Sequence, residues 1–429
     1  MNHPSPRPDT LRIGVFFDGT GNNRFNSLEH LEAQPFEPSH ASQGKALTNV
    51  ALLYELYPCV GQPAAGQPAT GRMYVEGVGT ARGQADLLWS QATGRGRTGV
   101  ARRVEQASQA LADQVAQHWQ ASGAGRPARV QVDLFGFSRG AAAARHLAND
   151  LQRGRQSQFM RALSDKVQVG CTVSLGFIGL FDTVVAVLAP FDDDHGGLDL
   201  ALAPGVAGQV VQLVAGDEHR YHFPLVPTAN DIVLPGAHSD IGGGYPTRLQ
   251  ERVLMCKPRS SRVPLATPVE QTAAYREVAA LRETLADTRV LTWERALAST
   301  RARRDEPAEK QVHAALLRER EVHGHLSRVA LRILHALARR AGVPLASLDE
   351  QDGRLAIPDE LRPIADTLEA MALGEREAPG LTPEQRRVLT SRYIHTSAHW
   401  NPIKGLRNSA LDTLYIDRPA PQGRRRVPG

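Results

Sequence analysis

The chain has 429 residues, of which 41% are hydrophobic and 22% charged, which is enough for a large globular core. Its net charge of +5 is small for this length. Such a charge allows weak attraction to acidic surfaces such as anionic lipid but does not require it, and we expect no nucleic-acid partner. The three cysteines, Cys59, Cys171 and Cys256, form no Cys-x-x-Cys pair, so neither a zinc site nor a redox dithiol is predicted.

The start of the chain carries no sign of a cleaved signal. Residues 1–9 are polar and proline-rich, and the first apolar run begins at Leu11. No apolar stretch reaches the roughly 18 residues that a membrane-spanning helix needs. We therefore expect synthesis in the cytoplasm, and export, if it occurs, by a route without a cleaved signal.

The first half of the chain alternates strands and helices. Apolar runs of strand length predict strands over 11–17, 72–75, 130–135, 172–181 and 231–234. Helical spacing of apolar residues predicts helices over 101–120 and 141–151. This alternation indicates an α/β fold, a mostly parallel sheet flanked by helices.

The second half is rich in Arg, Glu, Ala and Leu. A stripe at helical spacing predicts a helix that Arg339 and Arg340 close: Val322, Leu326, Val329, Ile333 and Leu337. Core packing is the favoured interpretation of this stripe, with a membrane- or partner-binding face as the alternative. We expect a core over 1–247, a helical insertion or membrane-targeting cap over 248–389, and a return segment over 390–429 that ends in a disordered basic tail from Pro419.

The strongest chemical signal is the segment Gly136-Phe137-Ser138-Arg139-Gly140. It follows a predicted strand and precedes a predicted helix, which is the setting of a nucleophile elbow. Small residues flank the serine because the turn is tight, and the exposed hydroxyl makes Ser138 the predicted nucleophile. The alternative is a tight turn whose serine only caps the helix.

A serine nucleophile needs a base that an acid orients, and in this fold the order along the chain is Ser, Asp or Glu, His. Asp182 follows the strand over 172–181, and His238 follows the strand over 231–234, so these are the predicted acid and base. Asp182 could instead cap a helix. Asp240 is an alternative acid, His395 and His399 are alternative bases, and His219 and His222 are weaker ones.

The loop after the first strand, Asp18-Gly19-Thr20-Gly21, is the predicted source of one oxyanion donor, and the N–H of Arg139 is the other. Gly19, Thr20 and Gly21 could also bind phosphate, although the loop lacks the lysine of a P-loop. Two acidic groups, Asp18 with Asp240 and residues 192–195, are weak candidates for a cation. We expect neither a metal nor a cofactor.

Five motifs occur in the order found in a known family. They are Phe16-Phe17-Asp18-Gly19-Thr20-Gly21-Asn22-Asn23, Gly77-Val78-Gly79-Thr80, the elbow, Asp182-Thr183-Val184, and Pro235-Gly236-Ala237-His238-Ser239-Asp240-Ile241-Gly242-Gly243-Gly244-Tyr245. Over residues 11–247 the chain resembles the domain of unknown function 2235 group, which contains the first family of type VI secretion lipase effectors. A weaker match lies at Tyr393–Ser397, and the helical part after Pro246 matches nothing in that pattern.

The resemblance implies an α/β-hydrolase fold and phospholipase A activity on bacterial glycerophospholipids. It implies delivery into the periplasm of a rival cell, with a secretion spike protein and a cognate immunity protein as partners. It also assigns the nucleophile to Ser138, the acid to Asp182 and the base to His238. Two other hypotheses are a soluble intracellular esterase or thioesterase, and a binding module that has kept the fold but lost catalysis.

Overall fold

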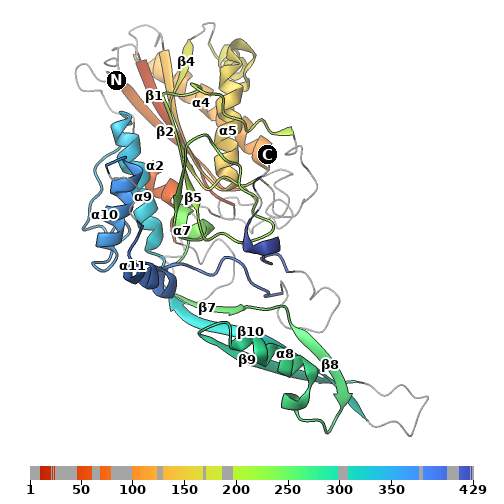
Figure 1. Ribbon diagram of the computed structural model, residues 1–429. Coiled ribbons are helices and arrows are strands. Elements are labelled where there is room, and N and C mark those ends of the chain that lie inside the picture. Colours follow the sequence, from red (N-terminus) through yellow and green to blue (C-terminus); the bar gives the residue numbers. More distant parts are fainter. Residues whose placement is uncertain are drawn as a thin grey trace.

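A computed structural model describes residues 10–20, 22, 24, 46–59, 68–78, 99–122, 129–167, 171–185, 197–297, 308–375, 380–402, 415–425 and 427. The core is a six-stranded sheet whose neighbouring strands are all parallel (Figure 1). Across the sheet the order is β2 (Ala69–Val75), β1 (Thr10–Phe17), β3 (Arg129–Phe137), β4 (Thr172–Phe181), β5 (Gln209–Ala215) and β6 (Asp231–Leu234). The predicted α/β class, a parallel sheet flanked by helices, is confirmed.

Helices cover both faces of the sheet because alternate side chains of its central strands point to opposite sides. On β1, Ile13 and Val15 belong to one core cluster and Phe16 to the other. The helices are α4 (Val100–Ser122), α5 (Arg139–Gln152) and α6 (Gln158–Ser164) at the first cluster, and α2 (Asn49–Leu56), α9 (Leu326–Arg340) and α10 (Arg362–Ala372) at the second. Figure 1 shows the two groups on either side of the sheet.

The register of the strands brings the loops that follow them to one edge. Phe17 pairs with Gly136, Phe137 pairs with Phe181, and Phe181 pairs with Leu213. The residues that come directly after these pairs therefore lie side by side at the carboxyl edge of the sheet, where ligands bind in open α/β folds.

The predicted strands and helices of the first half are all present, and 172–181 and 231–234 have the predicted bounds. The strand β5 was not predicted, since Gln212 interrupts its apolar run. Gln212 is nevertheless fully buried, because its side chain accepts a hydrogen bond of 3.1 Å from Arg145 Nη2.

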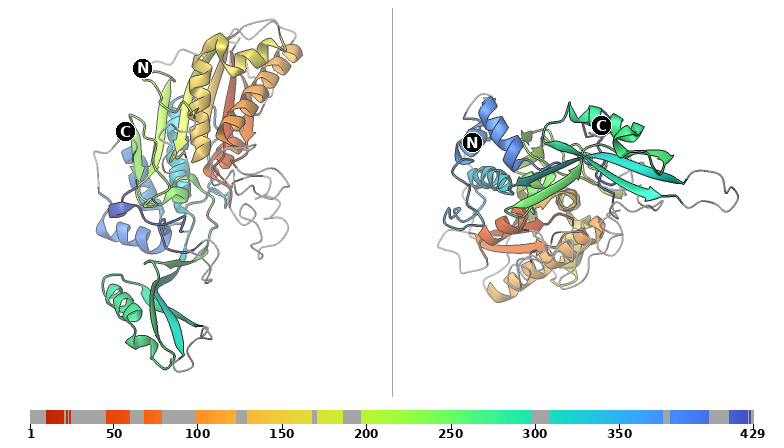
Figure 2. Two further views of the ribbon diagram at one scale, coloured as in Figure 1. Left: turned by 90° about the vertical axis from the view of Figure 1, so that its right-hand side faces the viewer. Right: turned by 90° about the horizontal axis from the view of Figure 1, so that it is seen from below.

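The predicted helical insertion over 248–389 is wrong for its first half. The chain there forms an antiparallel sheet of β7 (Leu249–Leu254), β8 (Arg259–Pro264), β9 (Thr288–Ala296) and β10 (Glu309–Val322), with α8 (Ala273–Arg282) packed on it. Figure 2 shows that this module projects away from the parallel sheet. Charged helix formers are tolerated in its strands because they pair across strands, as Arg289 does with Glu319 at 2.9 Å.

The predicted apolar stripe does form a helix, α9, from Leu326 onward. Its first member, Val322, is instead the last residue of β10. Leu326, Val329, Ile333 and Leu337 are buried in the second core cluster, so the stripe is core packing and the alternative of a membrane-binding face is wrong. The short helix α11 (Pro383–Val388) follows α10. No helix within the described ranges has the length and apolar character needed to cross a membrane. The domain limits at 247 and 389 remain predictions.

The tail is the last difference from expectation. Residues 415–425 follow a defined path, and the short turn of 3-10 helix η6 (Pro421–Gly423) lies within them. The predicted disorder from Pro419 is therefore wrong up to Arg425. The backbone of this segment is held by hydrogen bonds, such as that from Ala420 N to His219 O at 2.8 Å.

Candidate active site

The loop between β3 and α5 has the backbone geometry of a nucleophile elbow. Ser138 is its only residue, and its φ of 59° and ψ of −125° lie outside the regions that L-residues favour. Its backbone N–H donates to Phe181 O at 3.0 Å, which fixes the turn against β4. Strain of this kind persists only where the surrounding structure enforces it, and it is typical of functional sites.

The glycines on either side of Ser138 are required by close packing. A Cβ on Gly136 would lie 2.5 Å from Ala141 Cα, and one on Gly140 would lie 2.3 Å from Phe17 O. Backbone atoms cannot move aside as a flexible side chain can. The elbow therefore packs directly against its own helix and against the end of β1.

Asp182 and His238 form a buried pair at the same edge. Asp182 follows β4, and His238 is the first residue of the short helix α7 (His238–Gly242), which follows β6. The distance from His238 Nδ1 to Asp182 Oδ2 is 2.6 Å, and Asp182 Oδ1 accepts from Ala215 N at 2.9 Å. Asp182 is fully buried and His238 is 5% exposed. The alternative role of Asp182 as a helix cap is not what the structure shows, since its carboxylate bonds to an imidazole.

The helix α7 lies on the elbow. The rings of His238 and Phe137 have centroids 4.7 Å apart, and a Cβ on Gly242 would lie 2.0 Å from the Phe137 ring. Phe223 covers another side of the imidazole at 5.1 Å. The three predicted residues Ser138, Asp182 and His238 are thus brought to one buried place, although they lie up to 100 residues apart, the separation of Ser138 and His238 in the sequence.

Burial and pairing shift the proton affinities of this pair. Burial by itself would raise the pKa of Asp182, but the cation of Arg425 and the hydrogen bond from His238 hold that pKa well below its ordinary value. Burial lowers the pKa of His238 from 6.5, and the effect of burial is larger than the opposing effect of the Asp182 carboxylate. The imidazole is therefore neutral at pH 7, as a general base must be.

The predicted oxyanion loop lies beside the elbow. A Cβ on Gly19 would lie 2.4 Å from the Phe137 ring, and Arg139 Nε donates to Thr20 Oγ1 at 2.6 Å. Burial lowers the pKa of Arg139 to about 9. Gly21 lies outside the described residues. The described part of the loop thus packs against Phe137 and Arg139 of the elbow.

The alternative acid and base form a second pair of their own. His395 Nδ1 lies 2.7 Å from Asp240 Oδ1, and Asp240 Oδ2 accepts from the backbone N–H groups of His395 and Ala237. Tyr245 stacks on the His395 ring with centroids 3.7 Å apart. The structure therefore pairs Asp182 with His238 and Asp240 with His395.

The remaining histidines have other surroundings. His222 packs edge-on against Tyr221, His399 Nε2 lies 3.7 Å from Asp417, and the backbone of His219 donates to Ser397. In the described part of the chain, no group of three or more His, Cys, Asp or Glu side chains could hold a metal ion. The candidate cation loop at 192–195 lies outside that part.

Three charged residues at the site were missed by the sequence analysis. Glu218 Oε2 accepts from His238 N at 3.3 Å, and Arg220 pairs with Glu218 at 2.7 Å. Arg425 donates to both carboxylate oxygens of Asp182. Glu218 was missed together with β5, which it follows, and nothing in the sequence near Arg425 indicates a contact 243 residues away.

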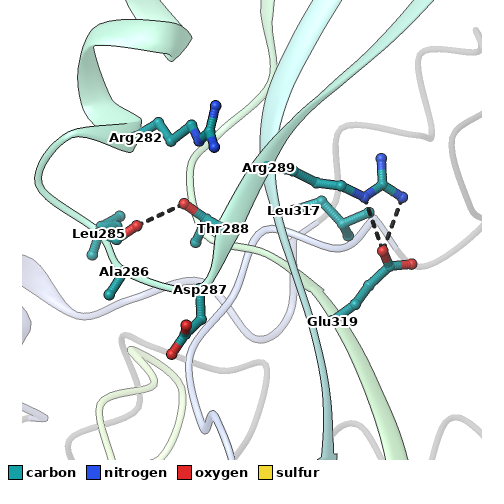
Figure 3. A pocket seen from close by; sticks show the side chains of 8 residues that line it. All are labelled: Arg282, Leu285, Ala286, Asp287, Thr288, Arg289, Leu317 and Glu319. Atoms are coloured by element: carbon teal, nitrogen blue, oxygen red, sulfur yellow. Dashed lines mark hydrogen bonds and ion pairs between the residues drawn. The ribbon is translucent and has the colours of Figure 1, made fainter.

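A pocket of about 490 Å³ lies in the antiparallel module (Figure 3). It is lined by the end of α8 and by β9 and β10, and the ion pair of Arg289 with Glu319 forms one wall. None of its lining residues carries the predicted chemistry. We place the site at Ser138 because only there do a strained serine and a buried acid–base pair occur together among the described residues.

The parallel sheet, the strained elbow and the buried Asp–His pair define an α/β-hydrolase-like protein. Residues 12–154 match the family model described as T6SS, Phospholipase effector Tle1-like, catalytic domain. The solved structure of the Tle1 effector bound to the VgrG spike from the type 6 secretion system is similar over 98% of this chain and 94% of that chain, with a TM-score of 0.77 and 27% identity. By these matches the chain is similar to the Tle1-like lipase effectors of type VI secretion, in agreement with the resemblance found in its sequence.

A second solved structure, an uncharacterized protein from Pseudomonas aeruginosa, aligns with a TM-score of 0.43 and 19% identity over 86% of this chain and 51% of that chain. No curated protein matches the sequence.

Proposed function

We propose that the chain is a phospholipase A-type serine hydrolase that cleaves acyl esters of bacterial membrane glycerophospholipids. Its similarity to Tle1-like effectors supports a phospholipase effector, and hence a lipolytic ester hydrolase. The observation that carries the finer proposal is the buried Asp182–His238 pair at 2.6 Å, beside a serine held at a φ of 59°.

In this proposal Ser138 Oγ attacks the acyl carbonyl while His238 takes the hydroxyl proton. The imidazolium then gives this proton to the leaving alcohol. Asp182 holds the imidazole in the tautomer and orientation that these proton transfers require. The N–H of Arg139 and one from the loop of Gly19–Gly21 stabilise the tetrahedral oxyanion. Water cleaves the acyl-enzyme by the same steps.

The partners are inferred from the same comparison. The solved Tle1 effector is bound to a VgrG spike and is similar over 98% of this chain, which supports a secretion spike protein as a partner here. We further propose delivery into the periplasm of a rival bacterium as an antibacterial effector, with a cognate immunity protein that protects the producer.

The test is acyl release from micelles of phospholipid labelled at sn-1 or sn-2, with the purified chain and its Ser138→Ala variant. We expect release by the first and a loss of at least about 10³-fold in the second, with unchanged thermal unfolding. The position of the label identifies the ester that is cleaved.

Labelling of Ser138 by a fluorophosphonate separates the other hypotheses. Labelling without lipid hydrolysis, together with turnover of short water-soluble esters, would contradict a lipid substrate. It would favour the hypothesis of a soluble esterase or thioesterase. A folded chain that neither hydrolyses an ester nor reacts with the probe would contradict catalysis and favour a binding module.

A further inference from the structure

The segment from 415 to 425 is attached to the loop after β5. Tyr221 N donates to Arg418 O at 3.0 Å, and Ala420 N donates to His219 O at 2.8 Å. Between them Arg220 and Pro419 form an antiparallel bridge. These bonds hold the segment beside Glu218, whose carboxylate accepts from the backbone of His238.

A tight turn then directs the chain toward the acid of the triad. Gln422 and Gly423 have φ values of 62° and 67°, so two successive residues are left-handed. For Gln422 this conformation is unfavourable, and contacts made elsewhere must compensate for it. Two residues after the turn comes Arg425, whose side chain is 7% exposed.

The guanidinium of Arg425 grips the carboxylate of Asp182 with two nitrogens. Nη1 donates to Oδ2 at 2.8 Å, Nη2 donates to Oδ1 at 2.6 Å, and Nη2 also reaches Ala215 O at 3.3 Å. Asp182 Oδ2 thus accepts from both Arg425 and His238. Bidentate pairs of this kind are geometrically specific, and this one is buried.

The cation changes the charge balance of the triad. In a triad with no further cation, the carboxylate neutralises the imidazolium that forms when the serine is deprotonated. Here Arg425 already neutralises Asp182, so the protonated His238 adds a net positive charge to a buried place. The other charged groups around His238 are Glu218 and Arg220, which neutralise each other, with Asp417 behind Arg220 at 3.2 Å.

We propose that Arg425 is a positioning residue of the triad. It orients the Asp182 carboxylate and reduces the effect of the carboxylate's negative charge on His238. This inference rests on the proposed function of Ser138, Asp182 and His238. It makes the segment from 415 to 425 part of the active site, and any binding event that displaced this segment would strengthen the base.

The experiment monitors the ring of His238 by NMR of the full chain carrying ¹³C-labelled histidine, with the signal assigned by its loss in His238→Gln. We expect Arg425→Gln to raise the pH midpoint of His238 by roughly one unit, because a nearby cation is removed. The acid limb of fluorophosphonate labelling of Ser138 should move upward with it. Arg425→Lys keeps the charge and should leave both midpoints near their original values.

The matched control is Arg424→Gln, which changes an exposed arginine one position away. It should shift neither midpoint. Arg425→Met is a second neutral variant, and thermal unfolding shows which variants are folded. An unshifted His238 midpoint in a folded Arg425→Gln or Arg425→Met protein would overturn the proposal.

Failure of the proposed function is read separately, on the unmodified chain. If Ser138 reacts with the probe but no phospholipid is cleaved, the lipid substrate is lost and the role of Arg425 is still decided by the titration. If Ser138 does not react at all, a shifted midpoint would describe a His238 that does not act as a catalytic base. The positioning role of Arg425 would then be rejected together with the triad.

Discussion

At the scale of single residues, the site depends on two residues held in unfavourable backbone conformations. Ser138 and Asp182 both have positive φ, 59° and 45°, although neither is glycine. Each is fixed by its neighbours: Ser138 N donates to Phe181 O, and Asp182 N donates to Leu213 O at 2.8 Å. The strained conformations are therefore enforced at the carboxyl ends of β3, β4 and β5, which hold the two residues.

The pH dependence of activity tests the state of the base. Burial holds the pKa of His238 below 6.5, so the ring is neutral above that value and becomes protonated as the pH falls through its lowered pKa. We expect kcat/KM to be constant near pH 7 and to fall only at a midpoint below 6.5. Asp182→Asn should reduce kcat by about 10³–10⁴-fold. An acid limb centred above pH 7 would contradict a buried, neutral base.

At the scale of elements, the short helix α7 carries His238, the proposed base, and the pair of Asp240 with His395 holds this helix. Asp240, two residues after the start of α7, accepts from His395 Nδ1, His395 N and Ala237 N. The segment with His395 is tied in turn to the antiparallel module, since Arg320 Nη2 donates to Ile394 O at 2.8 Å. His395 thus connects the module to the helix of the base.

His395→Ala and His238→Ala should therefore differ. Removing His395 takes one buried partner from Asp240 and should lower the free energy of unfolding by about 1–3 kcal/mol, measured by denaturant unfolding. Most of the ester hydrolysis should remain, because His395 pairs with Asp240 and not with Asp182. His238→Ala should abolish it. A loss in His395→Ala as deep as that in His238→Ala would reopen the assignment of the base.

At the scale of the whole molecule, the antiparallel module has a core separate from that of the parallel sheet. Ala274 and Val278 of α8 pack on Ala314 and Leu316 of β10, and the two large clusters lie around the parallel sheet. Separate cores allow parts of a protein to open locally without global unfolding. The module and the triad should therefore respond differently to a core mutation.

Val278→Ala removes a fully buried side chain and should destabilise the module by about 2 kcal/mol. We expect faster hydrogen exchange in 249–297 and 308–322 and unchanged fluorophosphonate labelling of Ser138. The control is Val233→Ala, at a valine that is 62% exposed, which should change neither quantity. A parallel loss of labelling in Val278→Ala would show that the module and the triad unfold as one unit.

Local patterns in the sequence were sufficient for five of the six strands of the parallel sheet and for the three candidate residues. Apolar runs, the glycines around Ser138, and the positions of Asp182 and His238 after strands are all properties of short segments. The antiparallel module was not predictable in this way, since its Arg- and Glu-rich strands have the composition of helices and are stabilised by cross-strand pairs.

The sequence by itself determined the class of fold, the elbow and the proposed chain order of nucleophile, acid and base, because each depends on contacts between near neighbours. Only the tertiary structure decided which acid pairs with which histidine. Asp182 pairs with His238, 56 residues away, and Asp240 pairs with His395, 155 residues away. The register of β4 and the packing of α7 determine these pairings. The contact of Arg425 with Asp182, 243 residues apart, depends in the same way on how the folded chain returns to the sheet edge.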